Sequence, residues 1–275
     1  MRISHLGPSG TYTEAAARRF SSTAELLPVA TVSAAIQAVR DGSADAAVCA
    51  MENSIEGSVS IETMDLLISP EFDLRICGEV VLAIQHHLVG APGINPAAAR
   101  VVYSHPQGLA QCRQRILELA PDAQPVAALS TAGAVEASLR EPGTLAVGSE
   151  YAAELYGATI YARDIGDERD NETRFVVLAR EDAQPTGDDK TSLAFTTAHD
   201  RPGSLVEVLQ MFAGHGLNLT RIESRPTRRQ LGTYVFFCDV QGHRSDPVVA
   251  GVLKEASQIT QWMRVLGSYP RWRRA

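Results

Sequence analysis

A polar segment near residue 185 divides the chain and limits how it can fold. Residues 180–190, REDAQPTGDDK, contain Pro, Gly and a run of charge but no hydrophobic periodicity, which is typical of a linker between domains. With 275 residues, the chain is also longer than the roughly 100 to 200 residues of one domain. The sequence therefore predicts two domains, residues 1–182 and residues 190–275.

Charge differs between the two parts. Residues 1–188 hold 13 Arg and no Lys against 25 Asp and Glu, whereas residues 189–275 hold 12 Lys and Arg against 7 Asp and Glu. The basic residues of the second part are scattered, and the one cluster is the terminal run Arg271–Arg274. A nucleic-acid partner is not expected, because such proteins gather their basic residues on one face or along one helix.

The N-terminal residues show no secretory signal, and no apolar run approaches the ~18 residues that a membrane span requires. We therefore expect a cytoplasmic protein without membrane association. The four cysteines lie far apart without a CxxC pair, which indicates reduced thiols rather than disulfides or a zinc site.

Short apolar runs alternate with helical patterns in the first part, which predicts an α/β domain. The predicted strands include residues 46–49, 101–103, 145–147 and 175–178. One helix is expected after Ser104, with Leu109, Cys112, Ile116 and Leu119 on one face, and others begin near Ser130 and Ser149. Parallel strands that lead into helices place many helix N-termini along one edge, where ligands of α/β sheets usually bind.

The second part shows a strand–helix–strand pattern twice. Strands are predicted at 193–197, 217–222, 234–240 and 261–266, and helices at 205–212 and 248–256. This βαββαβ order predicts a ferredoxin-like domain with both helices on one face of an antiparallel sheet.

Three segments carry polar side chains at the ends of predicted strands. Thr173-Arg174-Phe175 begins an apolar strand after a charged loop, so Arg174 could clamp a carboxylate and Thr173 could donate a proton or hydrogen bond, although an ordinary strand start is the more common reason for such a pattern. The turn at residues 7–12 fits a plain tight turn as well as an anion-binding nest. Residues 52–58 fit a helix cap as well as a site.

Metal or nucleophile chemistry is not indicated. The histidines at positions 5, 86, 87 and 105 do not show ligand spacing with carboxylates. There is no GxSxG motif and no Cys/His arrangement that indicates a nucleophile. We expect a protein without a metal.

Taken together, five segments resemble the prephenate dehydratase family. They are GPSGTYTEAA at 7–16, MENSIEGSV at 51–59, SHPQGLAQC at 104–112, STAGAV at 130–135 and NETRF at 171–175. The second part resembles an ACT domain, through PGSLVEVLQMF at 202–212 and NLTRIESRP at 218–226. No chorismate mutase segment precedes residue 1, so the monofunctional type with a C-terminal ACT domain is expected.

The resemblance implies a catalytic domain of two α/β lobes, like a type II periplasmic binding protein, with chain crossings near 78–87 and 165–175 and the active site between the lobes. The family reaction needs no cofactor: prephenate loses its ring carboxylate as carbon dioxide and its 4-hydroxyl as water, giving phenylpyruvate for L-phenylalanine biosynthesis. Aromatisation drives this reaction, so the enzyme mainly supplies geometry and one proton.

The resemblance also assigns site residues. Thr173 would assist the loss of the hydroxyl, beside Asn171, Arg174 and Phe175. The implied substrate-binding residues are Ser9, Thr11, Asn53, Ser54, Ser104, His105, Gln107, Ser130 and Thr131.

The implied effector of the ACT domain is L-phenylalanine, bound across a subunit interface of a homodimer or homotetramer, where it would close the catalytic clefts. The residues implied for this site are Pro202, Gly203, Ser204, Leu205, Asn218, Leu219, Glu223, Ser224, Arg225 and Pro226. A dimerisation domain without a ligand is the alternative.

Two further functions stay open at this point. An arogenate dehydratase is possible because Tyr12, Thr13 and Ala50-Met51 depart from the usual family pattern. A non-catalytic, amino-acid-sensing binding protein would keep the same two-lobe fold.

Overall fold

The computed structural model describes all residues except 59, 199–200, 228–232 and 274–275. Val59, the last residue of the second motif, therefore lies outside the described residues. The chain separates into two compact units, of which the first contains residues 1–60 and 81–175 and the second contains residues 61–80 and 176–275.

The first lobe contains a sheet in the order β2-β1-β3-β11-β5, with the short β4 paired to β3, and the chain passes between the two units within β5 and within β11. Strand β1 pairs in parallel with both β2 and β3. The strands are β1 (Arg2–Leu6), β2 (Glu25–Val29), β3 (Ala46–Asn53), β4 (Gly57–Ser58), β5 (Arg75–Ala83) and β11 (Glu172–Ala179). Helices α1 (Tyr12–Phe20) and α2 (Val32–Arg40) contact this sheet, so the carboxyl ends of β1 and β3 lie at the edge where α1 begins.

The second lobe contains a sheet in the order β10-β6-β9-β7-β8. Its strands are β6 (His87–Gly90), β7 (Val101–Ser104), β8 (Gln124–Ala127), β9 (Thr144–Gly148) and β10 (Thr159–Ala162). Strand β7 is parallel to β8 and β9, whereas β6 runs antiparallel to β9 and β10. The sequence analysis predicted parallel strands here, and the structure adds the antiparallel strands β6 and β10.

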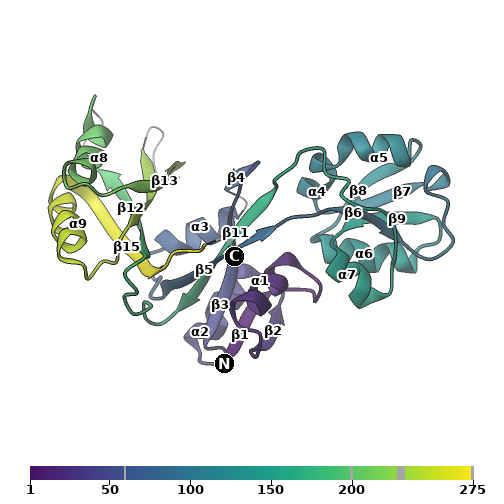
Figure 1. The fold of residues 1–275 in the computed structure, drawn as a ribbon, viewed down its shortest axis with the longest axis horizontal. Coiled ribbons are helices and arrows are strands. Elements are labelled where there is room, and N and C mark those ends of the chain that lie inside the picture. The colour runs from purple at the N-terminus through teal and green to yellow at the C-terminus, as the bar shows by residue number, and fades with distance from the viewer. Residues whose placement is uncertain (59, 199–200, 228–232, 274–275) are drawn as a thin grey trace. The chain divides into compact units, whose positions relative to one another are not determined.

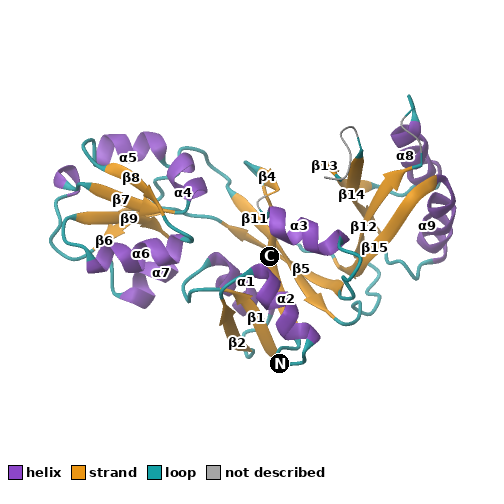
Figure 2. Ribbon diagram, turned by 180° about the vertical axis from the view of Figure 1, so that it is seen from behind, coloured by secondary structure: helices purple, strands orange, loops and turns teal. Residues whose placement is uncertain are grey.

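Helices cover both faces of this second sheet (Figures 1 and 2). Leu145 and Val147 belong to one hydrophobic core with Ile116, whereas Ala146 belongs to another core with Val135. Successive strand residues point to opposite faces, so an uninterrupted apolar strand requires two covered faces. The helices are α4 (Pro106–Gln111), α5 (Arg113–Leu119), α6 (Thr131–Arg140) and α7 (Glu150–Tyr156), with a 3-10 turn at Pro96–Ala98.

The prediction of one continuous helix after Ser104 is wrong, because the structure divides this helix at Cys112 into α4 and α5. The carboxylate of Asp167 accepts hydrogen bonds from the backbone amides of Gln114 at 3.1 Å and Arg115 at 3.3 Å. A carboxylate at these amides caps the start of a new helix. The cap comes from a loop far along the sequence, so periodicity alone does not reveal it.

Unit 2 contains the predicted βαββαβ domain. Its strands β12 (Asp189–Thr197), β13 (Leu219–Pro226), β14 (Tyr234–Gln241) and β15 (Thr260–Pro270) form an antiparallel sheet in the order β13-β14-β12-β15. Helices α8 (Ser204–Gly214) and α9 (Pro247–Ile259) cover one face of this sheet (Figure 1). Phe212 of α8 and Val252 of α9 share a core with Phe195 of β12. The predicted fold class is confirmed.

Residues 61–80, which form helix α3 (Ile61–Ile68) and the first part of β5, group with the C-terminal domain in unit 2. Arg264 of β15 donates hydrogen bonds to the carbonyl oxygens of Leu67 and Ser69 at the end of α3, at 3.3 and 2.6 Å. Backbone of β15 also approaches β5 so closely that a Cβ on Gly267 would lie 2.1 Å from the Ile76 carbonyl oxygen. Only glycine fits there.

Candidate active site

A cavity of about 220 Å³ lies in unit 1 at the ends of β1 and β3 and at the starts of α1, α4 and α6. Of the residues predicted for the site, eight line it: Thr11, Asn53, His105, Gln107, Ser130, Thr131, Thr173 and Phe175. Five others are absent from the described lining: Ser9, Ser54, Ser104, Asn171 and Arg174.

The described lining contains no Arg, Lys, Asp or Glu side chain. An anionic ligand would therefore meet hydroxyl groups, amides and the N-terminal ends of α1 and α6, which carry partial positive charge and unpaired N–H groups. The cavity could therefore bind an anion through hydrogen bonds and helix N-termini, without a positively charged side chain in its described lining.

Thr173 is held by Asn53 at the start of β11. The side-chain Nδ2 of Asn53 donates to Oγ1 of Thr173 at 3.0 Å and to the carbonyl oxygen of Glu172 at 3.1 Å. Its Oδ1 accepts the backbone N–H groups of Ile55 at 3.0 Å and Glu56 at 3.2 Å. The amide orientation is thus fixed by backbone donors, and Thr173 receives a hydrogen bond on its hydroxyl oxygen.

Asn171 does not line the cavity but supports the residues that do. Its Oδ1 accepts from Asn53 Nδ2 at 2.6 Å, and its Nδ2 donates to Gln111 Oε1 at 2.9 Å. The structure thus brings the first and third residues of the NETRF segment to one polar cluster.

Arg174 points away from this cluster. Its guanidinium lies 3.1 Å from the carboxylate of Glu52, and its side chain is 6% exposed. Neighbouring residues on a strand face opposite sides, so Thr173 and Phe175 line the cavity while Arg174 does not. The geometry does not favour the predicted carboxylate clamp.

The glycine turn at residues 7–12 has already used two of its amides. Gly10, in the left-handed region with φ +91°, donates its N–H to the carboxylate of Glu14 at 2.7 Å, and Gly7 donates to the Val29 carbonyl oxygen at 2.8 Å. Burial would raise the pKa of Glu14, but hydrogen bonds from Arg18, the Gly10 amide and Tyr151 outweigh it and hold the pKa below its usual value. The turn therefore binds a carboxylate of its own chain.

Two predicted binding residues serve as helix caps at the cavity. Thr11 Oγ1 accepts the Glu14 amide at 3.2 Å and donates to the Leu6 carbonyl oxygen at 3.0 Å. Ser130 caps α6 by accepting the Gly133 amide at 2.9 Å. Both side chains fix helix starts whose remaining amides are available to a ligand.

Three predicted serines outside the described cavity lining make hydrogen bonds within unit 1, and among the described residues Ser9 does so through its backbone alone. Ser104 is fully buried and donates to the Val147 carbonyl oxygen at 2.8 Å. Ser54 accepts the Glu172 amide at 2.9 Å and donates to the Asp170 carbonyl oxygen at 3.1 Å, which holds the start of β11. The carbonyl oxygen of Ser9 accepts from Tyr156 of the other lobe at 2.7 Å.

The sequence analysis missed His86 and Gln111 as site residues. His86 Nε2 lies 3.0 Å from Gln111 Oε1, and both residues line the cavity. Gln111 falls four residues after Gln107 within the SHPQGLAQC motif, so helical spacing places the two on one face. This spacing was the available signal for Gln111.

Burial lowers the pKa of both cavity histidines below the usual 6.5. For His86 a hydrogen bond to Gln111 opposes this shift, and for His105 the carboxylate of Glu56 does. Both imidazoles are therefore neutral at pH 7 and act as hydrogen-bonding groups rather than as cations.

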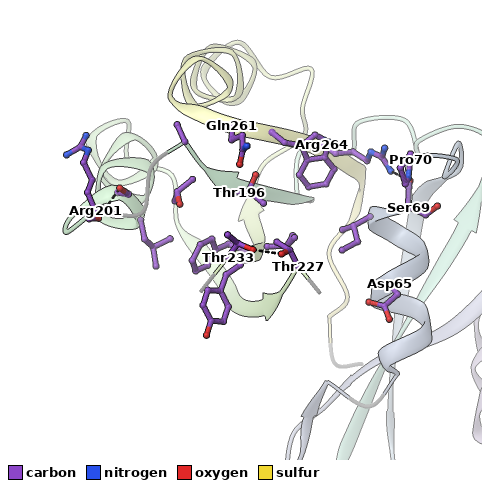
Figure 3. Close-up of a pocket in the computed structure, with 18 residues that line it drawn as sticks. Asp65, Ser69, Pro70, Thr196, Arg201, Thr227, Thr233, Gln261 and Arg264 are labelled. Carbon is purple, nitrogen blue, oxygen red and sulfur yellow. Dashed lines mark hydrogen bonds between the residues drawn. The ribbon is translucent and has the colours of Figure 1, made fainter. Parts of the chain in front are cut away.

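A second cavity, of about 990 Å³, lies within unit 2 between α3 and the exposed face of the sheet (Figure 3). Ser204 and Leu205 of the predicted effector site line it, beside Arg201, Thr196 and Gln261. The other predicted effector residues are outside the described lining: Pro202, Gly203, Asn218, Leu219, Glu223, Ser224, Arg225 and Pro226.

The 223–226 segment instead contacts α3. Arg225 makes an ion pair with Asp65 at 2.7 Å and donates to the Ile61 carbonyl oxygen at 3.0 Å, and Glu223 pairs with Arg221. Of the two predicted effector segments, only the 202–205 segment contributes side chains to the described lining of the 990 Å³ cavity.

Among the described residues, no helix is both long and apolar enough to cross a membrane.

Comparison with known proteins identifies the chain's relatives. The family model described as "Prephenate dehydratase" matches residues 3–183, and the model described as "ACT domain" matches residues 191–258. The bifunctional chorismate mutase/prephenate dehydratase of Aquifex aeolicus is 42% identical over 98% of this chain and 74% of its own length. Arogenate dehydratase 1 of Petunia hybrida is 40% identical over 98% of this chain and 67% of its own length.

Solved structures agree with this assignment. The prephenate dehydratase of Arthrobacter aurescens, solved in complex with L-Phe, superposes with a TM-score of 0.88 and 38% identity, covering 98% of this chain and 90% of that one. The segments that form the cavity lie within the matched residues 3–183. The chain therefore belongs to the prephenate dehydratase family and carries a C-terminal ACT domain.

Proposed function

We propose that the chain converts prephenate to phenylpyruvate, carbon dioxide and water, as a step of L-phenylalanine biosynthesis. The observation that carries this proposal is the Asn53–Thr173 hydrogen bond in a cavity whose described lining has no charged side chain. Because Thr173 Oγ1 accepts from Asn53, its own O–H can point to a ligand as a donor.

The chemistry needs a positioned donor more than a strong acid. When the ring carboxylate leaves as carbon dioxide, the electron pair of the broken bond moves into the ring, and the C4–oxygen bond breaks as the ring becomes aromatic. Thr173 would donate a hydrogen bond to the departing oxygen, which carries growing negative charge and takes up a proton from solvent to leave as water. A threonine hydroxyl is too weak an acid to transfer its proton without a neighbour's help.

Binding of a dianion would depend on nearby donors. The first part of the chain carries 25 acidic residues against 13 arginines, so its long-range field opposes an anion. Charges in water are screened beyond about 10 Å, whereas the helix N-termini of α1 and α6 would act at contact distance. The hydroxyls and amides at the cavity are the groups suited to the two carboxylates.

The decisive experiment compares two substrates. Purified protein is incubated with prephenate or with arogenate, and phenylpyruvate or phenylalanine is measured against the spontaneous rate. Faster turnover of prephenate supports the proposal, and faster turnover of arogenate makes the chain an arogenate dehydratase. The absence of turnover on both would leave an amino-acid-sensing binding protein.

L-phenylalanine is the proposed effector of the ACT domain, in a cytoplasmic homodimer or homotetramer. Support comes from the solved relative that is described in complex with L-Phe. Ser204 and Leu205 line the unit 2 cavity, and Arg225 of the 223–226 segment pairs with Asp65, which also lines it. The effector site and the oligomer are tested by calorimetry with phenylalanine and by light scattering.

A further inference from the structure

A chain of hydrogen bonds connects Glu56 to Thr173 through three side-chain amides. Gln111 Nε2 donates to Glu56 Oε1 at 2.7 Å, and Asn171 Nδ2 donates to Gln111 Oε1 at 2.9 Å. Asn53 Nδ2 then donates to Asn171 Oδ1 at 2.6 Å and to Thr173 Oγ1 at 3.0 Å. Gln107 Nε2 donates to the other oxygen of Glu56 at 2.8 Å.

The carboxylate at one end determines the direction of this chain. A carboxylate accepts hydrogen bonds and donates none, whereas an amide has one accepting and one donating end. Gln111 must therefore turn its NH₂ group towards Glu56 and its oxygen towards Asn171. Asn171 must then turn its Oδ1 towards Asn53. The Nδ2 group of Asn53 therefore donates hydrogen bonds to Asn171 and to Thr173.

A second constraint requires the same orientation at the other end. The oxygen of Asn53 is held by the backbone N–H groups of Ile55 and Glu56. Backbone N–H groups only donate, so they exclude the flipped amide without reference to Glu56. Both ends therefore make Thr173 Oγ1 an acceptor within the protein and leave its O–H for a ligand.

Gln111 also determines the tautomer of His86. Its Oε1 accepts from Asn171 and lies 3.0 Å from His86 Nε2. With Oε1 facing the ring, Nε2 must carry the proton, and Nδ1 of the neutral imidazole is then unprotonated. His86 lines the cavity and is 5% exposed.

We propose that Gln111, oriented by Glu56, is a positioning residue that fixes the donor direction of Thr173 and the tautomer of His86. The role of Gln111 towards Thr173 rests on the proposed function, because the donor direction of Thr173 matters only if Thr173 acts on the substrate. This series of hydrogen bonds orients side chains and does not relay protons, since its three central members, Gln111, Asn171 and Asn53, are amides. Neither Gln111 nor Glu56 is needed to touch the substrate.

The first test removes the central amide. Gln111→Met keeps the length of the side chain but neither donates nor accepts, and we expect kcat to fall at least about tenfold with KM changed less than about threefold. Gln114→Met, an exposed glutamine on α5, is the matched control and should keep wild-type kcat. An unchanged kcat in folded Gln111→Met protein would overturn the proposal.

The second test restores the direction with exchanged partners. Gln111→Glu alone sets two carboxylates against each other, so we expect a similar loss of kcat. In the double variant Glu56→Gln/Gln111→Glu, the amide at 56 donates to the carboxylate at 111, which still accepts from Asn171 and His86. We expect kcat to return to within about fivefold of wild type; a double variant no faster than Gln111→Glu would contradict the proposal.

A third measurement does not depend on activity. Nitrogen-15 NMR of the histidine rings, with His86 assigned from a His86→Gln variant, should show His86 protonated on Nε2 in the wild type. In Gln111→Met we expect a mixture of tautomers. An unchanged tautomer would refute the inference even in an active enzyme, whereas a wild type that makes no phenylpyruvate would instead refute the proposed function.

Discussion

The Nδ2 atom of Asn53 lies 3.0 Å from the Oγ1 atom of Thr173, although the two residues are 120 positions apart in the chain. Asn53 ends strand β3 and Thr173 follows the first residue of β11, so the pairing exists only where these strands reach the cavity. It gives the threonine hydroxyl one defined partner and leaves its O–H to donate a hydrogen bond to the substrate, and the first two predictions follow from it.

Replacing Thr173 by alanine should lower turnover of prephenate by at least about 10²-fold, the size of the loss when one hydrogen-bond donor to developing negative charge is removed. The side chain is small, so thermal stability should change little. Thr173→Ser keeps the hydroxyl and should retain most activity. Phenylpyruvate formation measures the effect, and a near-normal rate in folded Thr173→Ala protein would refute the role of the hydroxyl.

The substitution Asn53→Asp tests the direction of the hydrogen bond with almost no change of shape. The new carboxylate would still accept the backbone amides of Ile55 and Glu56, but it cannot donate to Thr173. The threonine hydroxyl would then donate to this carboxylate instead of the substrate, and kcat should fall by about 10²-fold. Circular dichroism at the assay temperature confirms folding. Wild-type kcat in this variant would show that the donor direction is irrelevant.

Arg174→Met should affect stability rather than substrate binding. Arg174 pairs with Glu52, whose side chain is 30% exposed, and loss of one partner of a partly buried pair should cost about 1–3 kcal/mol. KM for prephenate should change less than about threefold. Glu52→Gln, which keeps an accepting oxygen, should be milder. A large rise in KM with unchanged unfolding free energy would favour the carboxylate clamp instead.

Asp65→Asn should weaken feedback by phenylalanine. Asp65 lies on α3 and pairs with Arg225 of the predicted effector segment, and α3 begins directly after Ser60, which lines the active-site cavity. We expect basal kcat within about twofold of wild type and inhibition by phenylalanine weakened about fivefold, within the usual range of coupling energies. Calorimetry separates loss of binding from loss of coupling, and unchanged inhibition would exclude this route.

Stability should fall as the pH is lowered from about 6.5. Burial lowers the pKa of His5, His86, His87 and His105 in the folded protein, so the unfolded chain binds more protons just below the unperturbed value of 6.5. The free energy of unfolding therefore rises with pH between the lowered histidine pKa values of the folded protein and about 6.5, because the unfolded chain binds more protons in this range. Urea unfolding between pH 5 and pH 8 measures the slope, which should be shallower in His86→Gln. A flat profile would contradict the buried neutral histidines.

The sequence analysis predicted local structure well wherever one periodic pattern decided it. Leu145 to Val147 was predicted as a strand and lies in β9, and the βαββαβ order of residues 190–275 was confirmed. It failed for the helix after Ser104, which is broken because Asp167, far along the chain, caps α5. For the turn at residues 7–12 it left a plain turn and an anion-binding nest open, and the structure shows the Gly10 amide bound to Glu14, four residues later.

The sequence by itself determined the family, the order of the elements and eight of the residues at the cavity, because motifs and periodicities are local properties of the chain. Only the tertiary structure decided which way these residues face. It placed Arg174 with Glu52, linked Glu56 to Thr173 through Gln111 and Asn171, and grouped residues 61–80 with the C-terminal domain. Each of these depends on contacts between residues far apart in the chain, which no local pattern contains.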